Sequence, residues 1–213
     1  MRILIACEFS GIVREAFIKY GHDVTSCDLN PSEIPGKHFQ GNVLDILNDN
    51  WDLMIAHPPC TYLTVTSNKW NKNIDLINKK TRVGIDRQIL TNDAYTFFMQ
   101  LVFAPIKRIA IENPVGYMST LWRKPDQIIH PWQFGHKASK RTCLWLKNLP
   151  LLRPSNIVEK GYYHTYKSGK RSSQWYYDAA LKSPEERLKV RNRTFKGIAD
   201  AMAAQWCDYL DNI

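Results

Sequence analysis

Two short segments of the chain combine residue types that could carry covalent chemistry. His57-Pro58-Pro59-Cys60 follows one apolar run, and Glu112-Asn113-Pro114 follows another. Two prolines restrict the backbone and present Cys60 just past a predicted strand, where a deprotonated thiol would be a nucleophile. A carboxylate at the end of a buried strand is costly unless it has a partner or a task. We expect burial to raise the pKa of Glu112, so that it can hold or donate a proton. The alternatives are an inert buried cysteine and a structurally paired glutamate.

Two further segments have the residue types of a nucleotide site. Phe9-Ser10-Gly11 lies between a predicted strand and a predicted helix, where glycine permits close backbone approach and a helix start favours a negative group. Asp28 follows the next strand, where an acidic residue can accept hydrogen bonds from ribose hydroxyls. A tight turn at Gly11 and a helix cap or solvent-facing carboxylate at Asp28 are the alternatives.

The elements that must position these residues alternate between strand and helix. Apolar runs predict strands at Arg2–Cys7, Val24–Cys27, Asp52–Ala56, Arg108–Ile111 and Thr142–Leu146. Amphipathic spacing predicts helices at Ile12–Tyr20, Thr91–Phe103 and Ile198–Tyr209. This order predicts an α/β fold, with a mainly parallel sheet and helices on both faces. The 213 residues fit one domain, 1–213, in which 151–193 lacks regular pattern and is predicted to be an insertion or flexible subdomain.

The charge is positive and unevenly distributed. The chain carries 29 lysines and arginines against 20 acidic residues, a net charge of +9. Residues 1–61 have an acidic excess, whereas 62–92, 137–150 and 151–197 each have a basic excess. Segment 159–177 interleaves tyrosines and a tryptophan with Lys160, Lys167, Lys170 and Arg171. Basic groups can pair with phosphates while aromatic faces stack on bases, which favours a nucleic-acid partner. A solubility surface and a small satellite core are the alternatives.

Composition excludes several classes. With 44% hydrophobic and 23% charged residues, the chain is expected to be globular. No apolar run approaches the roughly 20 residues that a membrane helix needs, so no membrane partner is expected. Five scattered cysteines without a C-x-x-C pair argue against a disulfide framework and a metal site. Cys7, Cys27 and Cys143 are expected to be inert strand residues. A reducing, cytoplasmic location is expected.

Taken together, these segments resemble the DNA cytosine-5 methyltransferases, in a small form often seen in phages. CEFSGIVREAF resembles the first cofactor motif, SCDLNP the ribose-binding turn and QGNVLDIL the adenine-contacting segment. DLMIAHPPCTYL resembles the Pro-Pro-Cys catalytic loop, and IENPVGYM the Glu-Asn strand. FGHKASKRTCLWL resembles the later basic motif, and RTFKGIADAMAAQW the last motif. The combination of PPC and EN is the specific part of this resemblance.

The resemblance implies a Rossmann-like, S-adenosylmethionine-dependent methyltransferase that acts on carbon 5 of cytosine in DNA, most simply duplex DNA. The implied catalytic residues are Cys60, Glu112, Lys140 and Arg141. The implied cofactor-binding residues are Phe9, Ser10, Gly11, Asp28, Asn42 and Pro58. Nucleic-acid contacts are expected from Lys137, Lys167, Lys170 and Arg171. A phage-encoded enzyme would work in the cytoplasm of its bacterial host.

The chain also departs from the family pattern. Val13 and Arg14 stand where further glycines are usual, and Asn42 stands where aspartate is common. A large target-recognition domain is replaced by a small insertion at about 151–190, which predicts a short or relaxed target sequence. Two alternatives therefore stay open. One is the same chemistry on single-stranded nucleic acid, RNA or a free cytidine nucleotide; the other is a non-catalytic nucleic-acid-binding relative. The sequence does not indicate an oligomeric state.

Overall fold

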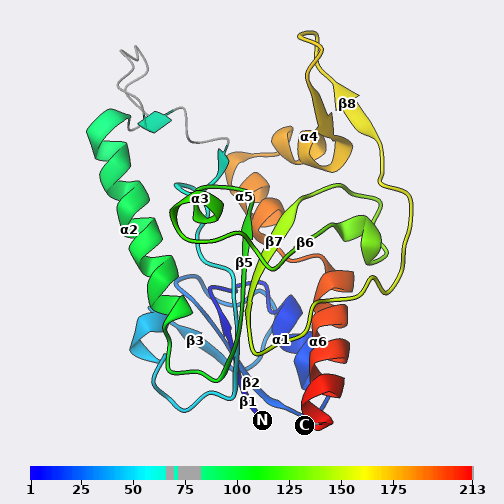
Figure 1. Ribbon diagram of the computed structural model, residues 1–213. Coiled ribbons are helices and arrows are strands. Elements are labelled where there is room, and N and C mark those ends of the chain that lie inside the picture. Colours follow the sequence, from blue (N-terminus) through cyan, green and yellow to red (C-terminus); the bar gives the residue numbers. More distant parts are fainter. Residues whose placement is uncertain (66–69, 72–82, 213) are drawn as a thin grey trace.

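A seven-stranded sheet forms the centre of the computed structural model, which describes residues 1–65, 70–71 and 83–212 (Figure 1). The strands run in the order β3-β2-β1-β4-β5-β7-β6. Their bounds are β1 Arg2–Ala6, β2 Asp23–Asp28, β3 His38–Gln40, β4 Leu53–Ala56, β5 Arg108–Pro114, β6 Gln127–Ile129 and β7 Thr142–Lys147. Strands β1 to β5 pair in parallel, and β7 is antiparallel to both of its neighbours. The predicted mainly parallel α/β fold, which is Rossmann-like, is confirmed.

Parallel pairing brings the carboxyl ends of the strands to one edge. Strands β4 and β5 are in register with Ala56 beside Ile111, so the next residues, His57 and Glu112, are neighbours at that edge. Strand β2, which ends at Asp28, and the turn after β1 open on the same edge. Ligands of open α/β sheets bind at this edge. The four candidate segments are therefore brought to one side of the sheet.

Helices cover both faces, as predicted. Helices α1 (Ile12–Ile18) and α6 (Lys196–Asp211) pack on one face, where their apolar side chains join Ile5, Ile55 and Ala110 in one core. Helices α2 (Gly84–Val102) and α3 (Met118–Leu121) contribute to the core of the other face (Figure 1). Because β5 side chains alternate and Ala110 faces α6, Glu112 points to the α6 face of the sheet.

Residues 151–193 are more regular than predicted. They contain the hairpin β8 (Tyr163–Thr165) and β9 (Arg171–Ser173), followed by α4 (Gln174–Ala180) and α5 (Pro184–Asn192). None of the residues in α5 is buried, and the two-stranded sheet is separate from the main sheet. Elements this short have little of the apolar periodicity on which a sequence-based prediction depends.

Other predicted elements differ from the structure mainly at their ends. Helix α2 begins at Gly84, seven residues before the predicted start at Thr91, and β5 continues through Pro114. Cys7 lies outside β1, in a turn with a φ of 58°, so its expected place within a strand was wrong. The described residues also include two 3₁₀ helices, Val43–Asp45 and Pro131–Gln133.

Candidate active site

Cys60, Glu112 and Lys140 converge at the carboxyl edge of the sheet. Cys60 lies in the loop after β4, Glu112 lies in β5, and Lys140 lies just before β7, which pairs with β5. The three are close enough that the charges of Glu112 and Lys140 both act on the Cys60 thiol. Arg141, the other predicted catalytic cation, is exposed and influences His130 and Cys143 instead. The structure therefore groups three of the four predicted catalytic residues.

His57 is the residue that sequence reasoning left without a role. Its Nδ1 lies 3.3 Å from Glu112 Oε2. The two side chains are only 8% and 16% exposed. Its signal in the sequence was adjacency to the Pro-Pro-Cys motif, but the contact depends on the β4–β5 register, which no single segment reveals.

Neighbouring charges and burial shift the pKa values of the Cys60 thiol and the Glu112 carboxyl group. Burial raises the pKa of the Cys60 thiol, the negative Glu112 raises it further, and Lys140 partly offsets both. Burial also acts to raise the pKa of Glu112, but Lys140 and the hydrogen bond from His57 outweigh it, so this pKa is lowered. The prediction of a raised Glu112 pKa was wrong, because it neglected the charge of Lys140 and the hydrogen bond from His57. The site at rest therefore holds an ionised carboxylate and a protonated thiol.

Two hydrogen bonds to backbone carbonyls hold the loop that carries Cys60. The Asn113 side-chain amide donates to the Pro58 carbonyl at 2.9 Å, and both residues are buried. Beyond Cys60, the Tyr117 N–H donates to the Leu63 carbonyl at 2.7 Å. These contacts join the Pro-Pro-Cys loop to the segment after Glu112 on either side of Cys60.

A small pocket lies beside Glu112 on the α6 face. Lys140 and Thr142 line it from the β7 side, and Asn192, Thr194, Phe195, Ile198 and Met202 line it from the chain at and after the end of α5. The sequence indicated the last segment only through its resemblance to a family motif. The structure thus brings residues far apart in the chain to one pocket with a carboxylate on its wall.

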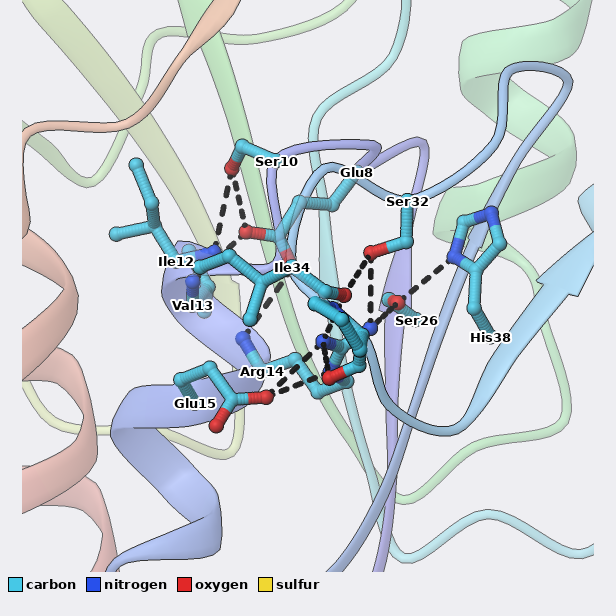
Figure 2. Close-up of polar contacts among 11 residues, drawn as sticks. Glu8, Ser10, Ile12, Val13, Arg14, Glu15, Ser26, Ser32, Ile34 and His38 are labelled. Carbon is cyan, nitrogen blue, oxygen red and sulfur yellow. Dashed lines mark hydrogen bonds and ion pairs between the residues drawn. The ribbon is translucent and has the colours of Figure 1, made fainter.

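The predicted anion site at the start of α1 is already filled by the protein itself. Glu8, only 4% exposed, accepts from the N–H groups of Val13 and Arg14 and from the Ser10 hydroxyl (Figure 2). The Ile12 N–H donates to the Ser10 hydroxyl oxygen. The expectation that this helix start favours an external negative group was therefore wrong, because Glu8 supplies that charge. Gly11, with φ at 74°, has the left-handed conformation that the turn requires.

Arg14 and Glu33 connect the turn after β1 to the loop after β2. The buried Arg14 guanidinium donates to Ser26, Ser32 and the carbonyls of Ile34 and Pro35 (Figure 2). The Glu33 N–H donates to the Phe9 carbonyl at 2.8 Å. The Glu33 carboxylate also accepts two hydrogen bonds from Arg193, at 2.8 and 2.7 Å. This network joins the first turn, the β2 loop and the segment after α5 around one edge of the site.

Asp28 ends β2 and Asn42 lies just after β3, and both use some of their hydrogen-bonding capacity within the protein. Asp28 Oδ1 accepts from the backbone and side-chain amides of Asn30, whereas Oδ2 has no hydrogen-bond partner within the described residues. Asn42 caps the first 3₁₀ helix by accepting from the Leu44 N–H. Leu29, directly after Asp28, is 74% exposed and is an apolar surface that sequence reasoning missed. Phe9, which precedes the turn at Gly11, is half-buried.

The basic residues of 137–171 lie partly in local pairs. Lys137 forms an ion pair with Glu159 at 3.3 Å, and Arg171 lies over the Tyr163 ring at 5.0 Å. Lys167 and Lys170 are exposed at the β8–β9 turn, and Tyr162, 83% exposed, precedes the hairpin. His164 stacks on Tyr177 at 3.5 Å between ring centroids, and both rings are half-buried, so part of the aromatic group packs against itself. In segment 62–92, residues 66–69 and 72–82 lie outside the described residues.

The other cysteines are described by their burial and by the charges that act on their thiols. Cys27, Cys143 and Cys207 are buried, and burial raises the pKa of the Cys143 thiol to about 11. Burial, followed by the negative Asp28, also raises the pKa of Cys7. Among the described residues, no group of three or more His, Cys, Asp or Glu side chains could hold a metal ion. No helix in the same part of the chain is long and apolar enough to cross a membrane.

Comparisons with known proteins give distant structural likenesses and no sequence match. No family model matches the sequence, and no curated protein matches it. Among solved structures, the chain is similar to a mutant of the DNMT2 protein of Spodoptera frugiperda, with a TM-score of 0.41 and 15% identity. The match covers 74% of this chain and 54% of the other, so the chain spans about half the length of that protein.

Proposed function

We propose that this protein transfers a methyl group from S-adenosylmethionine to carbon 5 of cytosine in DNA, through a covalent adduct with Cys60. The observation that carries the proposal is the convergence of Cys60, Glu112 and Lys140, two of which line a small pocket. A thiol, a buried carboxylate and a cation at the carboxyl edge of a Rossmann-like sheet are the groups that this chemistry requires. The resemblance of the Pro-Pro-Cys and Glu-Asn segments to the cytosine-5 methyltransferases supports the same assignment.

The residues at the end of β2 suit the cofactor. Asp28 has one carboxylate oxygen without a partner among the described residues, which suits a ribose hydroxyl, and the exposed Leu29 beside it suits an adenine face. The amides at the start of α1 do not contribute, because Glu8 occupies them. S-Adenosylmethionine, when bound, supplies an electrophilic methyl group.

The protein residues supply the nucleophile and the charge control. Cys60, as a thiolate, forms a bond from sulfur to carbon 6 of the base, and its electron pair makes carbon 5 nucleophilic. Glu112, ionised at rest, accepts from the exocyclic amino group, and ring nitrogen 3 takes up a proton from solvent as the adduct forms. After methylation, the proton on carbon 5 and the proton on ring nitrogen 3 both leave to solvent, the sulfur–carbon bond breaks and the Cys60 thiolate returns. Lys140 favours both anions in this cycle.

Because the pKa of Cys60 is raised, this cycle requires a step that forms the thiolate. A thiol that is mostly protonated is a weak nucleophile, so the thiolate must form when substrate arrives. Pairing of Glu112 with the amino group of the base would weaken the repulsion between the carboxylate and the thiolate. We therefore propose that binding of the base itself activates Cys60, which protects the enzyme from side reactions in its absence.

Nucleic acid is the proposed substrate because of where the positive charge lies. Lys167, Lys170 and Arg171 lie in the β8–β9 hairpin, with the exposed Tyr162 just before it. Phosphates can pair with the cations while a base stacks on the tyrosine. If the substrate is a duplex, the target base must leave the stack to reach Cys60. A hairpin this small favours a short or relaxed target sequence.

Labelled methyl transfer tests the proposal and its alternatives together. The protein is incubated with S-adenosylmethionine carrying a labelled methyl group and, in parallel, duplex DNA, single-stranded DNA, RNA or cytidine triphosphate. We expect label in duplex DNA, at carbon 5 of cytosine. Label in RNA alone or in the free nucleotide alone would show that this molecule, and not DNA, is the substrate. Label in none of the four would favour a non-catalytic nucleic-acid-binding protein.

A further inference from the structure

His57 has a contact that the proposed chemistry does not yet use. It is the first residue after β4, and its Nδ1 faces Glu112 Oε2 at 3.3 Å. Within the described residues, neither His57 Nε2 nor Glu112 Oε1 has a hydrogen-bond partner, although both atoms are buried. Each side chain therefore has one engaged polar atom and one unengaged polar atom. Buried polar atoms without partners are costly, which points to a function for at least one of them.

The proton on this histidine can be assigned from its neighbour. An ionised carboxylate offers only acceptors, so His57 Nδ1 must carry the hydrogen that joins the two residues. The hydrogen bond occupies Oε2 and opposes rotation of the carboxylate, a torsion with broad intrinsic preferences. The remaining oxygen, Oε1, belongs to a side chain on the wall of the pocket.

We propose that His57 is the positioning residue that holds Glu112 with Oε1 as the only oxygen free to pair with the target base. This inference rests on the proposed function. The next residue, Asn113, donates to the Pro58 carbonyl, so Glu112 and Asn113, at consecutive β5 positions, connect β5 to the loop after β4 through His57 and Pro58. The charge of Lys140 also acts on Glu112, and without His57 the carboxylate is free to turn toward Lys140. A turned carboxylate would pair with Lys140 at the expense of the base.

Two substitutions distinguish the hydrogen bond of His57 from the space that its side chain fills. His57→Leu fills the same region but removes the donor, whereas His57→Asn places an amide N–H near the position of Nδ1. Titration of the Glu112 carboxyl carbon by NMR, with the signal assigned by its loss in Glu112→Gln, needs no substrate. Because the His57 hydrogen bond lowers the pKa of Glu112, we expect His57→Leu to raise this pKa and His57→Asn to keep it close to that of the wild type.

Adduct formation is the second readout. With duplex DNA that contains 5-fluorocytosine, we expect His57→Leu to form the Cys60 adduct about 100-fold more slowly, the usual cost of misplacing a reacting group by about 1 Å. His57→Asn should recover most of that rate, with unchanged affinity for S-adenosylmethionine in both variants. Thermal unfolding of each variant identifies any general loss of structure.

The possible results are distinct. An unchanged Glu112 pKa in His57→Leu, or a His57→Asn variant as slow as His57→Leu, would overturn the positioning role. If the wild-type protein forms no adduct with any cytosine substrate, the proposed function fails instead. In that case the carboxyl titration alone decides whether His57 holds Glu112.

Discussion

Replacing Gly116 by alanine would disturb the loop that carries Cys60 without touching a catalytic group. Gly116 is buried in the segment after β5, and a Cβ there would lie 1.9 Å from the Leu63 carbonyl oxygen and 2.8 Å from its carbon. Real Cβ atoms essentially never approach another atom within 3.0 Å. The two segments must therefore separate by about 1 Å, which exceeds what a packed interior absorbs without strain.

The cost follows from the contacts that hold the two segments together. Separation weakens the hydrogen bonds from Tyr117 N–H to Leu63 (2.7 Å) and from Val65 N–H to Val115 (3.2 Å). At about 0.5–1.5 kcal/mol each, these two bonds account for about 1–3 kcal/mol. Residual overpacking adds about 1 kcal/mol or more. We expect Gly116→Ala to lower the free energy of unfolding by about 2–4 kcal/mol.

The same shift should slow the chemistry. A displacement of about 1 Å between Cys60 and Glu112 is expected to cost about 100-fold in the rate of adduct formation. The assays are urea unfolding followed by circular dichroism, and adduct formation with 5-fluorocytosine DNA, without denaturant and at a temperature well below the unfolding midpoint. Together they separate loss of the folded protein from misplacement of the loop.

Gly169→Ala is the matched control. Gly169 lies at the β8–β9 turn with φ at 76°, and no atom lies within 4 Å of the position that an alanine Cβ would occupy. Alanine there meets only backbone strain of roughly 1–2 kcal/mol. It should leave the adduct rate within a few-fold of wild type. A Gly116→Ala protein with wild-type unfolding and a wild-type adduct rate would refute the close packing of these two segments.

Three further predictions concern the cofactor, the nucleic acid and the charges. Asp28→Ala should weaken S-adenosylmethionine binding by about 2 kcal/mol, roughly thirtyfold, because hydrogen bonds to a charged acceptor are lost; unchanged affinity in calorimetry would exclude this ribose contact. Joint replacement of Lys167, Lys170 and Arg171 by alanine should weaken DNA binding about equally across sequences and flatten the salt dependence of affinity, as measured by fluorescence anisotropy. A loss confined to one sequence would instead indicate base readout. Lys140→Met should raise the pKa values of both Glu112 and Cys60, since Lys140 lowers both. The pH profile of Cys60 alkylation should therefore shift to higher pH, and the stability that ionised Glu112 contributes above its unfolded-state pKa should be lost at a higher pH on acidification. Profiles that coincide with those of the wild type would show that Lys140 does not act on the pair.

Five of the seven strands, β1, β2, β4, β5 and β7, could be predicted because most of their residues are buried. Strands β3 and β6 were not predicted, because each is three residues long and mostly outside the core. Runs such as ILIA, residues 3–6, and LMIA, residues 53–56, are continuously apolar, and the turn or the prolines that follow each run mark where the strand ends. The residues at those ends, Asp28, Cys60 and Glu112, were identified for the same reason. The hairpin at 163–173 was not predicted, because its strands are three residues long and mostly exposed.

Features that depend on pairing between distant segments were out of reach. The His57–Glu112 contact needs the β4–β5 register, and the clash at Gly116 needs the path of the loop after Cys60. Glu8 was overlooked as the cap of α1 because a glutamate at a strand end gives no sign of where its side chain turns. The predicted direction of the Glu112 pKa shift was wrong for a similar reason. The sequence pattern indicated that Glu112 is buried, but it did not reveal Lys140 and His57 as its neighbours.

The most direct test of the central claim is the intact mass of the protein after incubation with S-adenosylmethionine and duplex DNA containing 5-fluorocytosine. Fluorine at carbon 5 cannot leave as a proton does, so an enzyme that works through a Cys60 adduct is trapped with the DNA attached. We predict a covalent complex with the wild-type protein and with Cys143→Ser, whose thiol is buried and whose pKa is raised to about 11. Cys60→Ser should form none while still folding. A complex that forms equally well with Cys60→Ser, or labelled methyl transfer by that variant at the wild-type rate, would contradict the account.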